Sequence, residues 1–192
     1  MAQDSTMRHD THSTTEQRGW STKRIAVTAL FCAVAAIATL FLEFPILPGV
    51  SWLKYDPSGI VALIAGFAFG PATAAAVSVI PYLVHLATAS GIYGVIMAVL
   101  ATFSLAVPAA LVYRHDTSLR GAILGMVVGA VVCLVACILG NVVITPFYAG
   151  MPVDAVVALI VPALLPFNLI KIVLNCVVCA LVYKPVTKAL GN

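Results

Sequence analysis

Long apolar stretches occupy most of this chain, and they limit the folds open to it more than any other feature of the sequence. Only short turns and charged segments interrupt the apolar sequence between Lys23-Arg24 and Tyr183. Hydrophobic residues make up 62% of the chain and charged residues 9%, whereas soluble domains have about 45–50% and about 25%. A soluble globule of this composition would expose large apolar patches, which aggregate or bind membranes. We therefore predict an all-α membrane protein that crosses the bilayer several times.

Turns and charged segments divide the apolar region into six predicted transmembrane helices, since one span needs about 20 residues. These helices cover residues 25–42, 59–69, 71–87, 92–113, 121–145 and 158–183, and the connections cover 44–58, 88–91, 114–120 and 146–154. The polar residues 1–22 cannot bury enough apolar surface to fold, which predicts a disordered cytoplasmic tail. Residues 23–192 are expected to form one six-helix transmembrane domain.

Basic residues gather on one predicted side of the membrane. They are Lys23, Arg24, Arg114, Arg120, Lys184 and Lys188. The opposite connections carry Lys54 against Glu43, Asp56 and Asp154. Because cytoplasmic loops of membrane proteins carry an excess of Lys and Arg, this distribution predicts that both termini are cytoplasmic.

A polar stripe runs along the last predicted helix. Asn168, Lys171 and Asn175 are spaced i, i+3 and i+7, which places them within an arc of about 60° on one helix face. A lysine inside the bilayer costs about 2.5–3.5 kcal/mol on insertion scales, so it needs a partner, a cavity or a path to the interface. An outward-reaching lysine is one interpretation; the two asparagines favour a polar cavity open to the outside. Asn141 either completes this cavity or bonds a neighbouring helix.

Several other patterns have structural interpretations. The five cysteines lie in apolar runs and read as small buried hydrophobic residues rather than metal ligands. His85 is expected to be an interior or interfacial histidine rather than a ligand. Gly121, Gly125 and Gly129 repeat every four residues, a spacing that lets membrane helices pack closely.

Catalytic motifs are absent from the sequence. It contains no phosphate-binding G-x-x-x-x-G-K-[ST], no G-x-S-x-G and no H-E-x-x-H. We therefore expect neither an enzyme nor an ATPase, no cofactor, no metal and no nucleic-acid partner. A membrane-embedded binder of small molecules fits best. The alternatives are a stand-alone secondary transporter, which would show inverted repeats that are not apparent here, and a purely structural membrane protein, which leaves the lysine unexplained.

Four segments resemble one family of membrane proteins. They are FPILP (44–48), LKYDPSGIVALIAGFAFGP (53–71), NVVITPFYAG (141–150) and LPFNLIKIVLN (165–175). In this order they are similar to the riboflavin-binding S components of energy-coupling factor (ECF) transporters, and LKYDPS and LPFNLIK are the most specific pieces. The similarity extends over nearly everything from Lys23 to Leu190.

This resemblance implies a six-helix subunit of a bacterial cell membrane that binds riboflavin, as transported ligand, near the outer surface. The loop between the first two helices covers the vitamin, and the subunit docks onto one transmembrane coupling protein and two cytosolic ATP-binding subunits. Ala29 and Ala33 match positions of the docking face. Asn168 and Lys171 match positions that contact the flavin ring.

The remaining candidate ligand contacts follow from the chemistry of a flavin. Its ring faces need apolar and aromatic walls, for which the candidates are Phe44, Trp52, Leu53, Tyr55, Phe147 and Tyr148. Its ribityl hydroxyls need polar partners, for which the candidates are Lys54, Asp56 and Asn141.

Three positions depart from the family pattern and keep the identity of the vitamin open. They are Gly59, where an Asp is usual, Pro81-Tyr82, where Lys-Asn is usual, and the segment 90–97, which lacks the usual acid. Another vitamin, such as the anionic pantothenate with Lys171 as its counter-charge, therefore remains an alternative.

Overall fold

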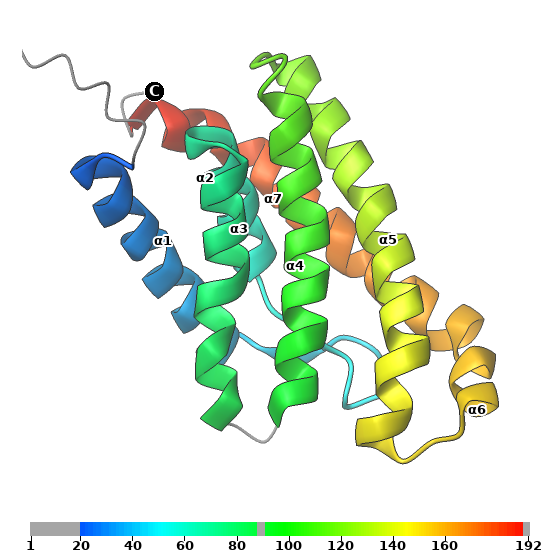
Figure 1. Cartoon of the computed structure of the whole chain (residues 1–192). Helices are drawn as coiled ribbons and strands as arrows, with labels where there is room; N and C mark the ends of the chain where they lie inside the picture. Colours follow the sequence, from blue (N-terminus) through cyan, green and yellow to red (C-terminus); the bar gives the residue numbers. More distant parts are fainter. Residues whose placement is uncertain (1–19, 88–90, 190–192) are drawn as a thin grey trace, which may run out of the picture.

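The computed structural model describes residues 20–87 and 91–189, so most of the predicted tail 1–22 and of the predicted turn 88–91 lies outside the described residues. Figure 1 shows a bundle of helices in which α4 and α5 form an antiparallel hairpin and α7 crosses behind them. The helices are α1 (Thr22–Phe41), α2 (Ser58–Phe69), α3 (Pro71–Val79), the 3₁₀ helix η1 (Ile80–Ala87), α4 (Gly91–Tyr113), α5 (Leu119–Ala149), α6 (Val153–Ala158), the π-helix η2 (Ile160–Leu164) and α7 (Leu165–Ala189).

Four described stretches are long and apolar enough to span a membrane. They are 22–41, 91–113, 119–149 and 160–186. The other two predicted spans correspond to shorter apolar helices, α2 and the continuous α3–η1 segment. The all-α class is therefore confirmed in its main part, and the predicted helices are found close to their expected positions.

Two local predictions are wrong. Residues 146–149 were expected in a loop, but α5 continues through Pro146, since the apolar context and neighbouring helices of a membrane protein tolerate the lost hydrogen bond. The helix expected from residue 158 instead begins as the short α6 and the π-helix η2, and α7 starts at Leu165. The connection 44–58 lies where it was predicted, and it contains two short antiparallel strands, β1 (Phe44–Pro45) and β2 (Lys54–Tyr55).

Turn and cap residues explain where several helices begin and end. The Ser21 and Ser118 hydroxyls accept bonds from backbone N–H groups in the first turns of α1 and α5, which satisfies donors that a helix start leaves unpaired. Gly70 adopts φ +86° between α2 and α3, a left-handed conformation that favours glycine. Pro81 lacks the N–H needed to continue α3, and the chain tightens there into η1.

Two glycines of the repeat on α5, Gly125 and Gly129, pack closely against α4, which is the kind of contact that their spacing predicts. A Cβ atom on Gly125 would lie 2.6 Å from the Ala109 carbonyl oxygen, and one on Gly129 would overlap the Leu105 carbonyl oxygen. Only glycine lets the two backbones approach this closely.

The outer surface of the bundle is apolar along its length. On α5 alone, exposed large side chains include Ile123, Leu124, Val127, Val131, Val135, Leu139 and Val143. Such a continuous apolar surface fits the acyl chains of a bilayer. Ala29 and Ala33 are also exposed, on the outer face of α1, so these alanines do not pack inside the bundle.

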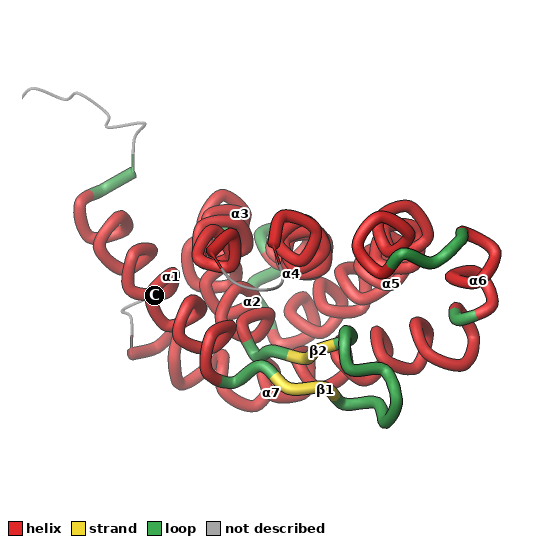
Figure 2. The backbone as a smooth tube through the Cα atoms, turned by 90° about the horizontal axis from the view of Figure 1, so that it is seen from below, coloured by secondary structure: helices red, strands yellow, loops and turns green. Residues whose placement is uncertain are grey.

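The β1–β2 hairpin lies across one end of the bundle. Viewed from that end, α3, α4 and α5 form a row along one face of the bundle (Figure 2). The hairpin lies at the opposite face, together with α7. The residues between the strands, including Leu47 and Trp52, pack into a second apolar cluster with Val156, Leu164 and Phe167. This cluster fixes the 44–58 segment to α6, η2 and the start of α7.

Candidate functional site

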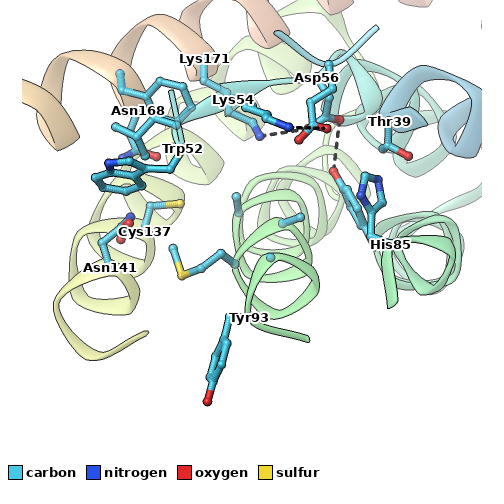
Figure 3. Close-up of a pocket in the computed structure, with 18 of the residues that line it drawn as sticks. Thr39, Trp52, Lys54, Asp56, His85, Tyr93, Cys137, Asn141, Asn168 and Lys171 are labelled. Atoms are coloured by element: carbon cyan, nitrogen blue, oxygen red, sulfur yellow. Dashed lines mark hydrogen bonds and ion pairs between the residues drawn. The ribbon is translucent and has the colours of Figure 1, made fainter. Parts of the chain in front are cut away.

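A cavity of about 360 Å³ opens beneath the β1–β2 hairpin, within the range of about 300–1,000 Å³ that small-molecule sites occupy. Side chains from α1, the hairpin segment, η1, α4, α5 and α7 surround it (Figure 3). Its lining residues are Thr39, Glu43, Trp52, Leu53, Lys54, Asp56, Tyr82, His85, Tyr93, Gly94, Met97, Ala98, Ala101, Cys137, Asn141, Tyr148, Phe167, Asn168 and Lys171.

Lys171 is buried in this cavity and paired with a carboxylate. Its Nζ lies 3.2 Å from Oδ2 of Asp56, and the residue is 9% exposed, so it does not reach outward to the membrane surface. Asp56 comes from the segment just before α2, 115 positions away in the sequence. The ion pair therefore joins the end of the hairpin segment to α7.

Hydrogen bonds hold the Asp56 carboxylate in place. Its Oδ1 accepts bonds from the Ser58 backbone N–H at 3.0 Å, from the Ser58 hydroxyl and from Tyr82 Oη at 3.3 Å. Tyr82 Oη also bonds Thr102 Oγ1 at 2.7 Å. Because each of these groups is buried, the carboxylate is fixed within a closed polar network. Asp56, a candidate partner of the ribityl hydroxyls, is instead the counter-ion of Lys171.

The third residue of the predicted stripe lies beneath the cavity and does not line it. Asn175 Oδ1 accepts a bond from Tyr55 Oη at 3.1 Å, and both side chains are buried. A Cβ atom on Gly59 would overlap the Asn175 amide, so the departure at Gly59 makes room for this asparagine. Tyr55, expected as a cavity wall, instead supports the floor.

The two cavity asparagines differ in how much of their amide is already bonded. Asn168 Nδ2 donates to the Leu164 carbonyl at 2.7 Å. In Asn141 both ends are bonded within α5, since Nδ2 donates to the Cys137 carbonyl at 2.8 Å and Oδ1 accepts from Thr145 at 3.0 Å. Asn168 therefore has more capacity left for a ligand.

Aromatic side chains line the mouth of the cavity. The rings of Trp52 and Tyr148 meet edge to face at 6.0 Å, and Tyr148 stacks on Tyr93 at 6.4 Å. Phe147 stacks on Tyr93 and is 69% exposed. It was a candidate cavity wall, but it does not line the cavity. Phe44 is also outside it, with its ring packed on Tyr55.

The structure thus brings most of the predicted ligand residues together. Asn168, Lys171, Asn141, Leu53, Lys54, Asp56, Tyr148 and Trp52 line one cavity. The cavity is also lined by residues that the sequence does not predict as ligand contacts, among them Thr39, Glu43, Tyr82, Tyr93, Met97 and Phe167. Of these residues, only Tyr82 has a feature in the sequence that could have pointed to the site, since its position departs from the family pattern. His85 lines the cavity as well, buried with its ring against that of Tyr82.

Comparison with known proteins identifies the kind of molecule this cavity belongs to. Residues 23–183 match the family described as the substrate-specific component of ECF transporters. The chain is 30% identical to the riboflavin transporter RibU of Staphylococcus aureus, over 84% of this chain and 89% of that protein. It is 28% identical to the riboflavin transporter FmnP of Bacillus subtilis, over 84% and 90% of the two chains.

A solved structure agrees with this assignment. The fold superposes on the S component of a bacterial ECF transporter with a TM-score of 0.76 and 26% identity, covering 88% of this chain and 98% of the other. These relatives are transporter subunits, not enzymes. The chain therefore belongs to the family of ECF transporter substrate-specific components.

Proposed function

We propose that this chain captures riboflavin in the cavity beneath the β1–β2 hairpin, for import driven by partner ATPases. The single observation that carries the proposal is the cavity itself, which the buried Lys171 and Asn168 line together with the aromatic side chains of the mouth. Two similar proteins are named riboflavin transporters, and the cavity has the chemistry that a flavin needs.

The polar side of the cavity suits the pyrimidine edge of the isoalloxazine ring. That edge presents an N–H flanked by carbonyls, and an asparagine amide both donates and accepts there. Lys171 uses one of its three N–H donors on Asp56 and has others for a ring carbonyl. Leu53, Trp52 and Phe167 provide apolar surface for the ring faces. The exposed Lys54–Glu43 pair, 3.5 Å apart, offers partners to the ribityl hydroxyls.

Replacement of Asn168 by Ala tests this assignment. Loss of a hydrogen-bonding partner in a desolvated site costs about 1–3 kcal/mol, which weakens riboflavin binding about 5- to 150-fold. Asn141→Ala is the matched control, and we expect a smaller loss because its amide is already bonded within α5. Fluorescence titration of the purified variants with riboflavin measures both. Unchanged affinity in Asn168→Ala would show that the flavin ring does not bond to Asn168 on α7.

We further propose that the chain crosses the membrane six times, with both termini in the cytoplasm. The start of α1, the α4–α5 turn and the end of α7 lie at the same end of the bundle (Figure 1). This end carries Lys23, Arg24, Arg114, Arg120 and Lys184, and basic loops favour the cytoplasm. The cavity and the hairpin then face outward.

Cysteine labelling in intact cells tests this orientation. In a cysteine-free variant, Thr117→Cys in the α4–α5 turn should resist a membrane-impermeant thiol reagent until the cells are broken open. Ser51→Cys in the exposed hairpin segment is the matched control and should react in intact cells. The opposite pattern would invert the orientation.

The proposed partners are a transmembrane coupling protein and two cytosolic ATP-binding subunits. Ala29 and Ala33 present small side chains one turn apart on the exposed face of α1, where a partner helix can approach closely. The chain by itself should bind its ligand without pumping it.

A further inference from the structure

The charged side chains at the cavity balance one another. Apart from His85, the charged residues that line it in the described part of the chain are Glu43, Lys54, Asp56 and Lys171. They form two ion pairs, Lys54 with Glu43 at 3.5 Å near the mouth and Lys171 with Asp56 at 3.2 Å inside. The lining therefore carries as many negative as positive charges.

We propose that Asp56 is a specificity-determining residue, which makes the cavity select neutral ligands over anionic ones. The proposal rests on the proposed function, because it names the charge class that the same site accepts. Without Asp56, the ammonium of Lys171 would be an unpaired buried cation, and such a cation attracts an anionic ligand. With Asp56, the positive charge is already compensated before any ligand enters.

The hydrogen bonds around Asp56 hold its carboxylate in position beside Lys171. Its Oδ1 is held by the Ser58 backbone N–H and hydroxyl and by Tyr82, while Oδ2 pairs with Lys171. A ligand anion that approached Lys171 would have to break this network or lie next to a second carboxylate. Like charges in a buried site repel strongly, because little water screens them.

A neutral ligand meets neither obstacle. The remaining N–H donors of Lys171 can bond a ring carbonyl while the ion pair with Asp56 stays intact. This favours a flavin over pantothenate, whose carboxylate would compete with Asp56 for Lys171.

The test compares riboflavin with analogues that carry a carboxylate on the ring, one at N3 and one at the benzenoid edge. The measured quantity is the ratio of dissociation constants, analogue over riboflavin, in the parent chain and in Asp56→Asn. Any steric effect of the added group cancels in this comparison. In Asp56→Asn we expect the ratio for at least one analogue to fall about tenfold or more, a change equal to about 1.4 kcal/mol. Equal ratios in the parent and the variant would overturn the proposal.

A second variant covers the case in which Asp56→Asn does not fold. Asp56→Asn/Lys171→Gln has no uncompensated charge and also lacks the carboxylate that repels anions. It is compared with Lys171→Gln, which differs from it only at Asp56. The ratio should be lower in the double variant than in Lys171→Gln, and equal ratios in the two would overturn the proposal. Failure of the parent to bind riboflavin would instead contradict the proposed function, so the two failures are distinguishable.

Discussion

Replacement of Lys171 by Met should destabilise this protein by about 3–5 kcal/mol, the usual cost of leaving one partner of a buried ion pair uncompensated. The methionine retains much of the volume of the lysine, so the effect comes from the Asp56 carboxylate, which is 6% exposed. For an intramembrane lysine without a partner, removal should be tolerated, since it deletes a costly charge. The ion pair with Asp56 reverses that expectation.

A double-mutant cycle isolates the contribution of the pair. Asp56→Asn should destabilise the chain as Lys171→Met does, whereas the double variant should recover most of the stability because neither charge remains. Lys54→Met is the matched control, since it breaks a more exposed pair with Glu43, worth about 0–1 kcal/mol. Thermal unfolding in detergent measures all four variants. Additive losses in the double variant would show that the two charges do not stabilise each other.

Replacement of Ala29 and Ala33 by Phe should abolish vitamin uptake in cells while leaving riboflavin binding unchanged. Both alanines are exposed on α1 and do not line the cavity, so the larger side chains project outward and keep a partner helix at a distance. Uptake of radiolabelled riboflavin by cells and titration of the purified variant separate the two effects.

A matched pair of substitutions on α5 controls for the added bulk. Val131 and Val135 are exposed at the same spacing, and their replacement by Phe should leave uptake intact if that face meets only lipid. Loss of binding in the Ala29/Ala33 variant would mean that this face of α1 supports the cavity. Retained uptake would show that the partner does not dock on this face.

The sequence predicts the helices well because their apolar runs are long and their turns carry Gly, Pro or charge. The spacing of Asn168 and Lys171 on one helix face likewise predicts that they share a cavity, since helix geometry is local. The packing of Gly125 and Gly129 against α4 follows from the same periodicity.

What the sequence does not predict depends on contacts between distant segments. The pairing of Lys171 with Asp56 joins residues 115 positions apart, and the bond between Tyr55 and Asn175 joins residues 120 positions apart. Gly59 has no side chain, and Asn175 fills the space that this leaves. This contact forms only when α2 and α7 pack together, so it cannot be predicted from either helix alone. The continuation of α5 through Pro146 depends on its surroundings, because proline alone predicts a break.

This chain alone should bind riboflavin in its outer cavity. The most direct measurement is an equilibrium titration of the purified chain, free of coupling protein and ATPases, with riboflavin, followed by flavin absorbance and by quenching of Trp52 fluorescence. We predict saturable binding of one riboflavin per chain, which an excess of pantothenate does not prevent. A folded chain that binds no riboflavin, or that binds pantothenate in its place, would contradict the assignment of this cavity to riboflavin.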